Sequence, residues 1–434
     1  MSQHYRKKIM ILGANPETLP IVQAANDMGL ETVVLDPNIG SPAKQAASIS
    51  VTVDALDVAA VCEVARKLQV DAVLVGVADT LVASYFDVCH ELGFPCYVSH
   101  EAQQSFSSKK RFCATVVKFG ISTTPQYSVS DIVAASQSMP LKFPILVKPD
   151  DNGGGVGITV CYNAQQAVCA IEKAQSFSKS GEVLVEEYMT ANDFFVYYEI
   201  VDGKPYLLAT ADRFKSEKQT VGSPVCIGAV YPSRHEREYV ISTHEKVTQM
   251  LQGLKVERGI FCLQFFKDAR DFFAYDPGFR FQGEGVHFHI QHAYSIDQRK
   301  GLIDYSIGKA IPDYVNELEN VRVGANNFPV TVWVLLSEGM IDRIVGMELL
   351  KDLRSYKSHI ERFRIGDCVT DAMQGTEKQV FARIYLQHEE KRVILEDLQF
   401  INENLKVLSK TGNMILDMLE CKKLEEIYIS REDL

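Results

Sequence analysis

The sequence lacks paired cysteines. Its ten cysteines are spread over 434 residues, and none belongs to a CxxC pair. Structural zinc sites and disulfide frameworks depend on closely or regularly spaced cysteines, so neither is expected here. Most of these cysteines lie within apolar stretches. We therefore expect buried free thiols in a reducing compartment, and a cytoplasmic protein.

Long apolar segments and basic blocks are also missing. No apolar run reaches the roughly 18 residues of a membrane span, and the basic start MSQHYRKK leads directly into a short strand. Acidic residues outnumber basic ones by 56 to 45, which gives a formal net charge of −11. These features argue against membrane, exported and nucleic-acid-binding proteins. A hydrophobic content of 46% is typical of a globular protein, here long enough for two or three domains.

The usual phosphate-binding loops are absent as well. There is no GxxxxGK[ST] motif, and the first turn, GANP, lacks the spaced glycines of a dinucleotide fingerprint. Glycines gather instead after the apolar strand FPILVKP, at Gly153, Gly154, Gly155 and Gly157. Because glycine lets backbone N–H groups approach phosphates closely, this loop is a candidate nucleotide cover, with a plain turn as the alternative.

The first hundred residues alternate strands and helices. The pattern predicts strands at 9–12, 32–35 and 72–75, and helices at 16–28, 58–68 and 80–92. Such alternation predicts a parallel, doubly wound, Rossmann-like sheet. Asp36 ends the second strand, where dinucleotide folds place an acid for ribose; without the glycine fingerprint, a structural or substrate-edge role is favoured.

The remaining chain predicts further strands and helices. A helix is expected from Lys109 to Gly120, and a strand at 183–185 runs into two acids. The other expected elements are a hairpin of 194–202 and 206–211, a strand pair at 259–267 and 271–275, strands at 330–336 and 380–386, and a helix at 389–404.

Four stretches follow one another in a specific order: SKKRFCATVVKFGISTTPQY, FPILVKPDDNGGGVGI, VLVEEYMTANDFFVYYEIVDG and GIFCLQFFKDARDFFAYDPGFRFQGEG. Together they resemble the ATP-grasp superfamily, in particular its carboxylate-amine ligases and its carbamoyl phosphate synthase and biotin carboxylase group. The resemblance implies an α/β fold in three parts. These are a Rossmann-like domain at 1–104, an ATP-grasp domain at 105–310 with a mobile lid at about 115–188, and a C-terminal α/β domain at 311–434.

The resemblance also implies which residues bind ATP. Lys109, with Lys110 as the alternative, and Lys148 would hold the phosphates under the glycine lid. Backbone groups at the hinge would bind adenine, and an acid would bind the ribose. The residues implied in these two roles are Glu186, Glu187 and Met189 at the hinge and Asp193 for the ribose.

Metal binding and catalysis are implied farther along the chain. Gln264 and Asp276 match the two metal positions, and oxygen ligands of this kind suit Mg²⁺. Gly278 stands where the family has a ligating asparagine, so the number of ions, one or two, stays open. Arg280 matches the arginine that grips the acyl phosphate or the substrate carboxylate. His287 and His289 would share one face of a strand, and a pocket or core role is favoured over a metal.

The function implied by the resemblance is an ADP-forming ligase. It would use ATP to activate a small carboxylate, such as an amino acid, as an acyl phosphate that an amine then attacks. A carboxyphosphate or carbamoyl phosphate type of ligase and a degenerate ATP-binding module without turnover are the alternatives. The expected partners are therefore small molecules, and a homodimer is the default assembly.

Overall fold

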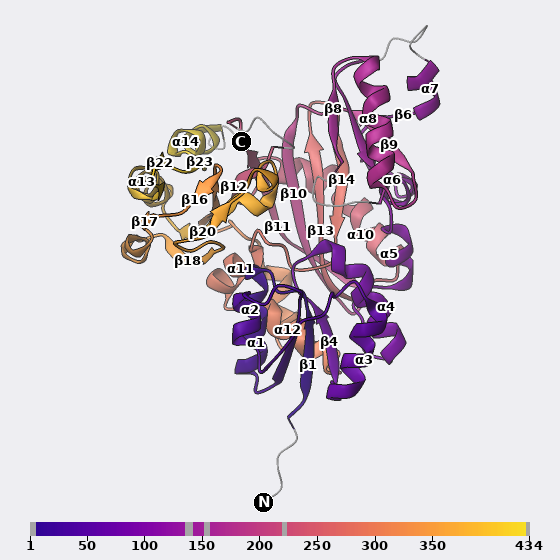
Figure 1. Cartoon of the computed structure of the whole chain (residues 1–434), viewed down its shortest axis with the longest axis vertical. Helices are drawn as coiled ribbons and strands as arrows, with labels where there is room; N and C mark the ends of the chain where they lie inside the picture. Colours follow the sequence, from indigo (N-terminus) through magenta and orange to yellow (C-terminus); the bar gives the residue numbers. More distant parts are fainter. Residues whose placement is uncertain (1–5, 135–141, 152–156, 219–223, 431–434) are drawn as a thin grey trace, which may run out of the picture.

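The computed structural model describes residues 6–134, 142–151, 157–218 and 224–430. Its N-terminal part is a parallel sheet in the order β3-β2-β1-β4, flanked by helices (Figure 1). The strands are β1 (Lys8–Leu12), β2 (Glu31–Leu35), β3 (Ile49–Val51) and β4 (Ala72–Val75). The helices are α1 (Leu19–Asp27), α2 (Pro42–Ala46), α3 (Val58–Leu68), α4 (Val82–Leu92) and α5 (His100–Ser105).

The Rossmann-like sheet predicted from the sequence is confirmed. Strands β1, β2 and β4 are almost wholly buried because helices cover the sheet, which is why they consist of nearly continuous apolar runs. Gly93 ends α4 in the left-handed conformation, with φ of 70°. Asp36 accepts hydrogen bonds from the backbone N–H of Ala14 at 2.9 Å and of Asn38 at 2.7 Å, so its carboxylate braces the turns beside the strand ends.

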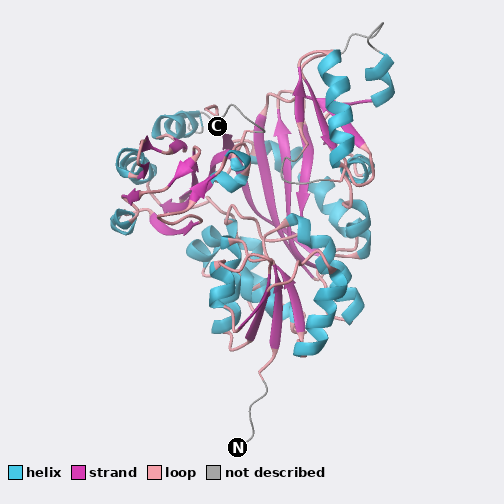
Figure 2. Cartoon of the chain, viewed as in Figure 1, coloured by secondary structure: helices cyan, strands magenta, loops and turns pink. Residues whose placement is uncertain are grey.

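A ten-stranded sheet forms the body of the molecule (Figure 2). Its main path runs β18-β20-β15-β12-β11-β10-β13-β14-β5, and β23 pairs with β15. Every pairing is antiparallel except that of β14 with β5. The central strands are β5 (Ser122–Thr123), β10 (Asn192–Val201), β11 (Lys204–Lys215), β12 (Cys226–Val230), β13 (Arg258–Lys267) and β14 (Phe272–Gly278).

Helices accompany this sheet. They are α9 (Glu236–Ser242), α10 (His244–Gly253), α11 (Val286–Tyr294) and α12 (Gln298–Ser306). The hairpin turn between β10 and β11 lies at Asp202-Gly203, as expected from the Asp-Gly pair. Both residues have positive φ, 52° and 70°, which asparagine, aspartate and glycine tolerate best.

A separate four-stranded sheet lies at one end of the main sheet, in the order β6-β9-β7-β8. Its elements are α6 (Lys109–Lys118), β6 (Gln126–Tyr127), α7 (Val129–Ala134), β7 (Ile145–Pro149), β8 (Thr159–Cys161), α8 (Ala164–Phe177) and β9 (Val183–Glu187). These strands and α8 enclose a small apolar core of their own. The unit therefore packs internally and projects from the main sheet (Figure 1).

The C-terminal segment extends the main sheet. Its strands in that sheet are β15 (Phe328–Leu336), β18 (Tyr356–Glu361), β20 (Val380–His388) and β23 (Ile415–Asp417). Short pairs are formed by β16 (Gly339–Met340) with β19 (Cys368–Val369), and by β21 (Lys406–Ser409) with β17 (Arg343–Val345) and β22 (Gly412–Asn413). Helices α13 (Lys391–Asn404) and α14 (Cys421–Ser430) complete it. In the sequence, β12 comes before the predicted domain boundary at residue 310 and β15 comes after it, yet the two strands pair in one sheet. The domain limits at 104 and 310 therefore stay predictions.

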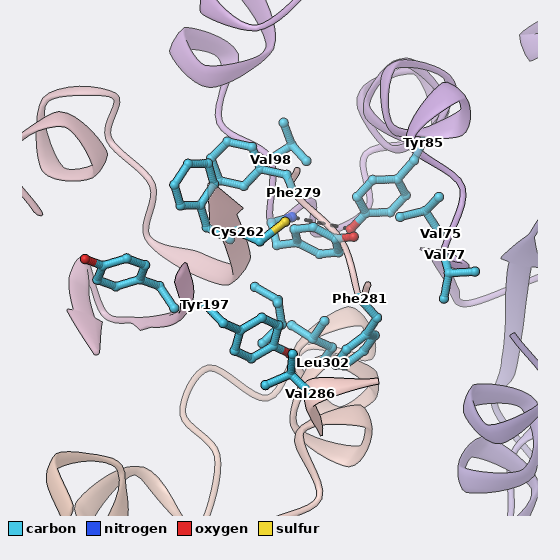
Figure 3. Close-up of a cluster of buried hydrophobic side chains, with 14 of the residues drawn as sticks. Val75, Val77, Tyr85, Val98, Tyr197, Cys262, Phe279, Phe281, Val286 and Leu302 are labelled. Atoms are coloured by element: carbon cyan, nitrogen blue, oxygen red, sulfur yellow. Dashed lines mark hydrogen bonds between the residues drawn. The ribbon is translucent and has the colours of Figure 1, made fainter. Parts of the chain in front are cut away.

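One apolar core joins the N-terminal part to the main sheet. Figure 3 shows Val75, Val77 and Tyr85 of the N-terminal part close to Cys262 and Phe279 of the main sheet. This packing holds the carboxyl end of β4 against β13 and β14. Within the described residues, no helix combines the length and apolar character needed to cross a membrane.

Glu199 is a buried acid on β10 whose charge should make stability depend on pH. It accepts hydrogen bonds from Gln298 Nε2 at 2.7 Å and Tyr314 Oη at 2.9 Å, but burial raises its pKa from 4.5 to about 7. Between these values the folded protein keeps a proton that the unfolded chain loses. Stability should therefore fall as pH rises from about 4.5 to 7, by at most about 3 kcal/mol from this group.

Urea unfolding at pH 5 and pH 8 checks this. Glu199→Gln should gain stability relative to the original chain on going from pH 5 to pH 8, since the amide cannot ionise. Glu317→Gln, at an exposed position, serves as the control and should follow the original chain. Identical pH dependence in Glu199→Gln and the original chain would contradict the assignment.

Candidate active site on the central sheet

Lys148 lies on the inner strand of the projecting unit. In the antiparallel pair β7–β9, Leu146 faces Glu186 and Lys148 faces Leu184, which makes Lys148 and Glu186 diagonal neighbours on one face. Lys148 Nζ and Glu186 Oε2 form an ion pair of 2.7 Å, and both side chains are buried. A buried lysine needs such a partner. Both residues were predicted from the sequence to belong to the ATP site.

Lys109 approaches the same place from the start of α6. The Ser108 side chain caps this helix, and Lys109 Nζ donates hydrogen bonds to the backbone carbonyls of Pro149 at 2.9 Å and Asp150 at 3.3 Å. Burial and the neighbouring Lys148 lower the pKa of Lys109. Lys110 instead forms an ion pair with Glu182 on the surface, so the geometry favours Lys109 over its neighbour as the phosphate ligand.

The glycine-rich segment joins β7, which carries Lys148, to β8. Gly153, Gly154 and Gly155 lie outside the described residues. Gly157 has φ of 78°, and a Cβ added there would lie 2.7 Å from Pro149 Cγ, so only glycine fits without a shift. The two flanking strands pair as an antiparallel hairpin, which is the connection expected for a covering loop.

The hinge residues line an open cavity of about 450 Å³. Glu187, Tyr188 and Met189 form one wall, and the segments 142–144 and 268–270 form others. Arg270 Nη2 lies 3.4 Å from Glu187 Oε1 and 3.6 Å from Met189 Sδ. Glu187 therefore faces this cavity while Glu186 faces Lys148. The mixed polar and apolar lining suits a heteroaromatic base.

Gln264 and Asp276 face each other across β13 and β14, and Gln264 Nε2 lies 3.2 Å from Asp276 Oδ2. Gln264 Oε1 accepts hydrogen bonds from Tyr275 Oη, at 2.7 Å, and from Arg213. Asp276 lies at an open edge of this face, yet desolvation by the surrounding protein and repulsion by Asp79 raise its pKa to about 6. The two candidate metal ligands are thus brought together.

Asp193 is buried on the same face of the sheet. Its carboxylate lies 2.7 Å from Lys215 Nζ and 3.5 Å from Arg213 Nη1, and both of its oxygens lie 3.1 Å from Tyr275 Oη. Although burial opposes ionisation, the two cations lower its pKa below the ordinary value. Ribose binding by Asp193 stays a prediction, and it would require Lys215 to move.

Arg280 follows β14 and points its guanidinium toward the N-terminal part. It pairs with Asp79, and its Nη1 donates to the Phe281 carbonyl at 2.9 Å. Burial would lower the pKa of Arg280, but Asp79 raises it above the ordinary value. A permanent cation therefore lies beside the Gln264–Asp276 pair, where a negatively charged substrate group could bind.

Sequence reasoning missed four charged residues of this site. Arg213 and Lys215 lie on β11, which continues to residue 215, beyond the predicted end at 211. The sequence did offer one sign of them: Arg213 and Lys215 are two residues apart, the spacing that places side chains on one face of a strand. Glu284 Oε1 lies 2.9 Å from Arg213 Nη2, and Asp79 follows β4; neither has a local pattern that marks it.

The expectation that His287 and His289 lie on a strand is wrong, because both are in α11. The first five residues of this helix are all buried, so the sequence there lacks the 3.6-residue spacing of apolar residues that indicates a helix. The two histidines, spaced by two, instead suggested a strand. His289 bonds Thr331 Oγ1 at 3.0 Å and Gln387 Oε1 at 3.2 Å, and burial lowers its pKa to about 3. It is a core histidine, and no group of three metal-binding His, Cys, Asp or Glu side chains occurs in the described part of the chain.

Several buried polar atoms at this site have no hydrogen-bond partner among the described residues. They are Arg213 Nε, Arg280 Nε, Gln282 Oε1 and Glu284 Oε2. Buried polar atoms are normally paired, so such a group points to a missing ligand. Cations for phosphates and oxygen atoms for Mg²⁺ are both present, and the donor set therefore fits a nucleotide with its metal.

The comparisons with known proteins agree with this geometry. Residues 111–219 match the family described as D-ala D-ala ligase C-terminus. The L-amino acid ligase of Bacillus licheniformis superposes with a TM-score of 0.74 at 14% identity, covering 93% of this chain and 99% of the other. Biotin carboxylase of Campylobacter jejuni also gives 0.74, at 15% identity, covering 97% and 95%. The chain has the ATP-grasp fold.

Curated protein sequences also resemble part of this chain. A phosphoribosylamine–glycine ligase of Allochromatium vinosum is 25% identical over 217 residues, which are 48% of this chain and 50% of that protein. The chain thus spans about half the length of the curated relatives it matches. The resemblance to ATP-grasp ligases and the α/β fold predicted from the sequence are confirmed, while the roles of individual residues stay predictions.

Proposed function

We propose that this protein is an ATP-dependent ligase that activates a small carboxylate as an acyl phosphate for attack by an amine. The observation that carries the proposal is the convergence of Lys148 and Lys109 on Asp276. Lys109 bonds the carbonyl of Pro149, which adjoins Lys148 on β7, and the charges of both lysines oppose the rise in the pKa of Asp276 that desolvation and Asp79 cause. Cations and an acid converging from separate elements suit a phosphoryl-transfer site.

The chain's own residues would divide the work. Lys148 and Lys109 would neutralise phosphate charge at the root of the glycine loop. The cavity at Glu187 and Met189 would hold the base. Glu186 would hold Lys148 aligned in its buried position through their ion pair, because a buried charge needs a partner.

Mg²⁺ would be held by Asp276 and by the amide oxygen of Gln264, with phosphate oxygens and water as further ligands. When bound, it would neutralise the charge that develops on the transferring phosphoryl group. Binding through Gln264 requires its carbonyl to leave Tyr275 and Arg213 or its amide to turn. One ion at Asp276 is therefore the minimum that the residues support.

The reaction forms and breaks two bonds in turn. An oxygen of the acid attacks the γ-phosphorus of ATP, and ADP leaves. The amine nitrogen then attacks the acyl carbon, phosphate leaves and the nitrogen gives up a proton. Arg280 would hold the substrate carboxylate and the acyl phosphate, and the lid would exclude water, which would otherwise hydrolyse that intermediate.

The experiment is a screen for ADP release with pools of amino acids and small carboxylates. We expect release that requires Mg²⁺, one acid and one amine together. Release with bicarbonate alone would instead identify a carboxyphosphate or carbamoyl phosphate type of ligase. Omission of each component in turn is the control.

A nucleotide-binding module without turnover is the second candidate, and the observation that favours it is Gly278. This glycine removes a side-chain ligand beside Asp276, and Gln264 adds no charge. Calorimetry with ATP separates the two functions. Tight binding without ADP release across the whole panel would contradict the ligase and support the module.

We further propose that the protein acts in the cytoplasm. All ten cysteines are free, and six of them are buried, as suits the reducing cytoplasm. The partners would be a small carboxylic acid and an amine. A homodimer is the assembly to test first, by light scattering, since two-fold dimers are the commonest oligomers.

A further inference from the structure

Gly278 leaves a gap in the set of metal ligands that its own strand cannot close. It lies opposite Cys262 across β13 and β14, and side chains at 276 and 278 would point to the same face because they are two residues apart. A Cβ at Gly278 would lie 2.8 Å from Cys262 Sγ, which is too close. Cys262 cannot withdraw easily, since it is buried in the core shown in Figure 3. An asparagine is therefore excluded unless Cys262 changes.

A carboxylate from another part of the fold reaches this gap. Asp79 follows β4 in the N-terminal part, and its Oδ1 lies 3.4 Å from the position of a Cβ on Gly278. Its other oxygen, Oδ2, pairs with Arg280. The side chain is 46% exposed, so Oδ1 is open to a ligand. One carboxylate oxygen of Asp79 thus pairs with Arg280, while the other lies next to the position that a side chain at residue 278 would occupy.

We propose that Asp79 is a metal ligand of this site and replaces, from the N-terminal part, the side chain that Gly278 lacks. The inference rests on the proposed ATP- and Mg²⁺-dependent function. Asp79 and Asp276 would hold a second divalent cation between them, next to the first ion at Asp276 and Gln264. A divalent cation between two carboxylates is attracted to both, and Asp79 Oδ1 lies 3.4 Å from the Cβ position of residue 278, two residues from Asp276.

This arrangement ties metal binding to the packing of the N-terminal part. In a site built from one domain, the ligands come from neighbouring strands. Here a complete site needs the loop after β4 to stay against β14, and the apolar core around Val75, Val77 and Cys262 holds it there. The N-terminal part would then contribute directly to ATP chemistry.

The test counts ions with Mn²⁺ and the non-hydrolysable analogue AMP-PNP, using electron paramagnetic resonance to measure free Mn²⁺. The original chain should bind two Mn²⁺ per AMP-PNP. Asp79→Asn should keep the tighter ion and weaken the second at least tenfold. Asp87→Asn, an exposed acid on α4, is the matched control and should bind like the original chain.

Two further variants separate a ligand from a residue that merely positions Arg280. Arg280→Ala frees Asp79, so it should keep the second ion if Asp79 is a ligand. Adding Gly278→Asn to the Asp79→Asn/Cys262→Ala chain should restore the second ion. The backbone at 278 accepts asparagine, because the φ of Gly278 is outside the left-handed region, and Cys262→Ala removes the clashing sulfur.

Three outcomes would overturn the inference: a single Mn²⁺ in the original chain, unchanged binding in Asp79→Asn, or loss of the second ion in Arg280→Ala. Each leaves Mn²⁺–AMP-PNP binding intact, and with it the proposed function. If the original chain binds no Mn²⁺–AMP-PNP at all, the proposed function fails and the inference fails with it.

Discussion

Lys148→Met should reduce ADP formation by roughly 10²- to 10³-fold, the usual effect of removing one preorganised charge contact at a reacting centre. Methionine keeps the length and the apolar stem of lysine but cannot neutralise phosphate. ADP release is measured at saturating acid and amine, and AMP-PNP affinity is measured by calorimetry. Weaker nucleotide binding should accompany the lower rate, because Lys148 would contact ATP before and during transfer.

Loss of Lys148 also leaves Glu186 buried without its ion-pair partner, which costs about 3 kcal/mol of stability in comparable cases. A second variant separates this effect from catalysis. Lys148→Met/Glu186→Gln removes the stranded charge and should recover most of the lost melting temperature without recovering activity. Lys110→Met, on the surface, is the matched lysine control. ADP formation at the original rate in Lys148→Met would contradict the site.

Asp276→Asn is expected to lower ADP formation by at least about 100-fold while leaving the fold as stable as before, or more stable. The two effects have opposite signs because the surrounding protein partly desolvates the carboxylate of Asp276 at its open edge and Asp79 repels it, which destabilises the protein without metal. Asparagine removes that repulsion but is a weaker ligand for Mg²⁺. The measurements are ADP release over a range of Mg²⁺ concentrations and the melting temperature without metal.

Higher Mg²⁺ should recover part of the activity of Asp276→Asn, as expected when a ligand is weakened rather than the fold. Asp202→Asn is the control, since it changes an aspartate in the hairpin turn between β10 and β11 where asparagine also tolerates positive φ. A lowered melting temperature with unchanged dependence on Mg²⁺ would show that Asp276 acts in folding and would remove it from the metal site.

Both variants probe a site that the resemblance to the ATP-grasp superfamily implied from the sequence. Lys148 also directly follows three apolar strand residues, and Gln264 and Asp276 match the metal positions of the family on facing strands. Helices such as α3, predicted at 58–68 and found at Val58–Leu68, follow from apolar periodicity and a capping aspartate. Such features depend on neighbours in sequence, and neighbours are visible in the chain itself.

Residues that join the site from far away in sequence were not predictable in this manner. Asp79 lies 201 positions from Arg280, its partner in the fold. Arg213 was missed because β11 continues as a strand beyond the point where its apolar run stops. The pair His287 and His289 misled for the opposite reason: the first five residues of α11 are all buried, so this part of the helix shows no 3.6-residue pattern.

The amino-acid sequence alone was therefore enough for the order of the elements, which depends on apolar periodicity, turns and contacts between adjacent strands. Its resemblance to the ATP-grasp superfamily implied the fold and the lysines beside the glycine loop. The tertiary structure decided which charges meet: Asp193 with Lys215, Arg213 with Glu284, and Asp79 with Arg280 beside Gly278. Coulomb interactions act through space, so two residues far apart in sequence acquire a joint role only when packing brings them within a few ångströms.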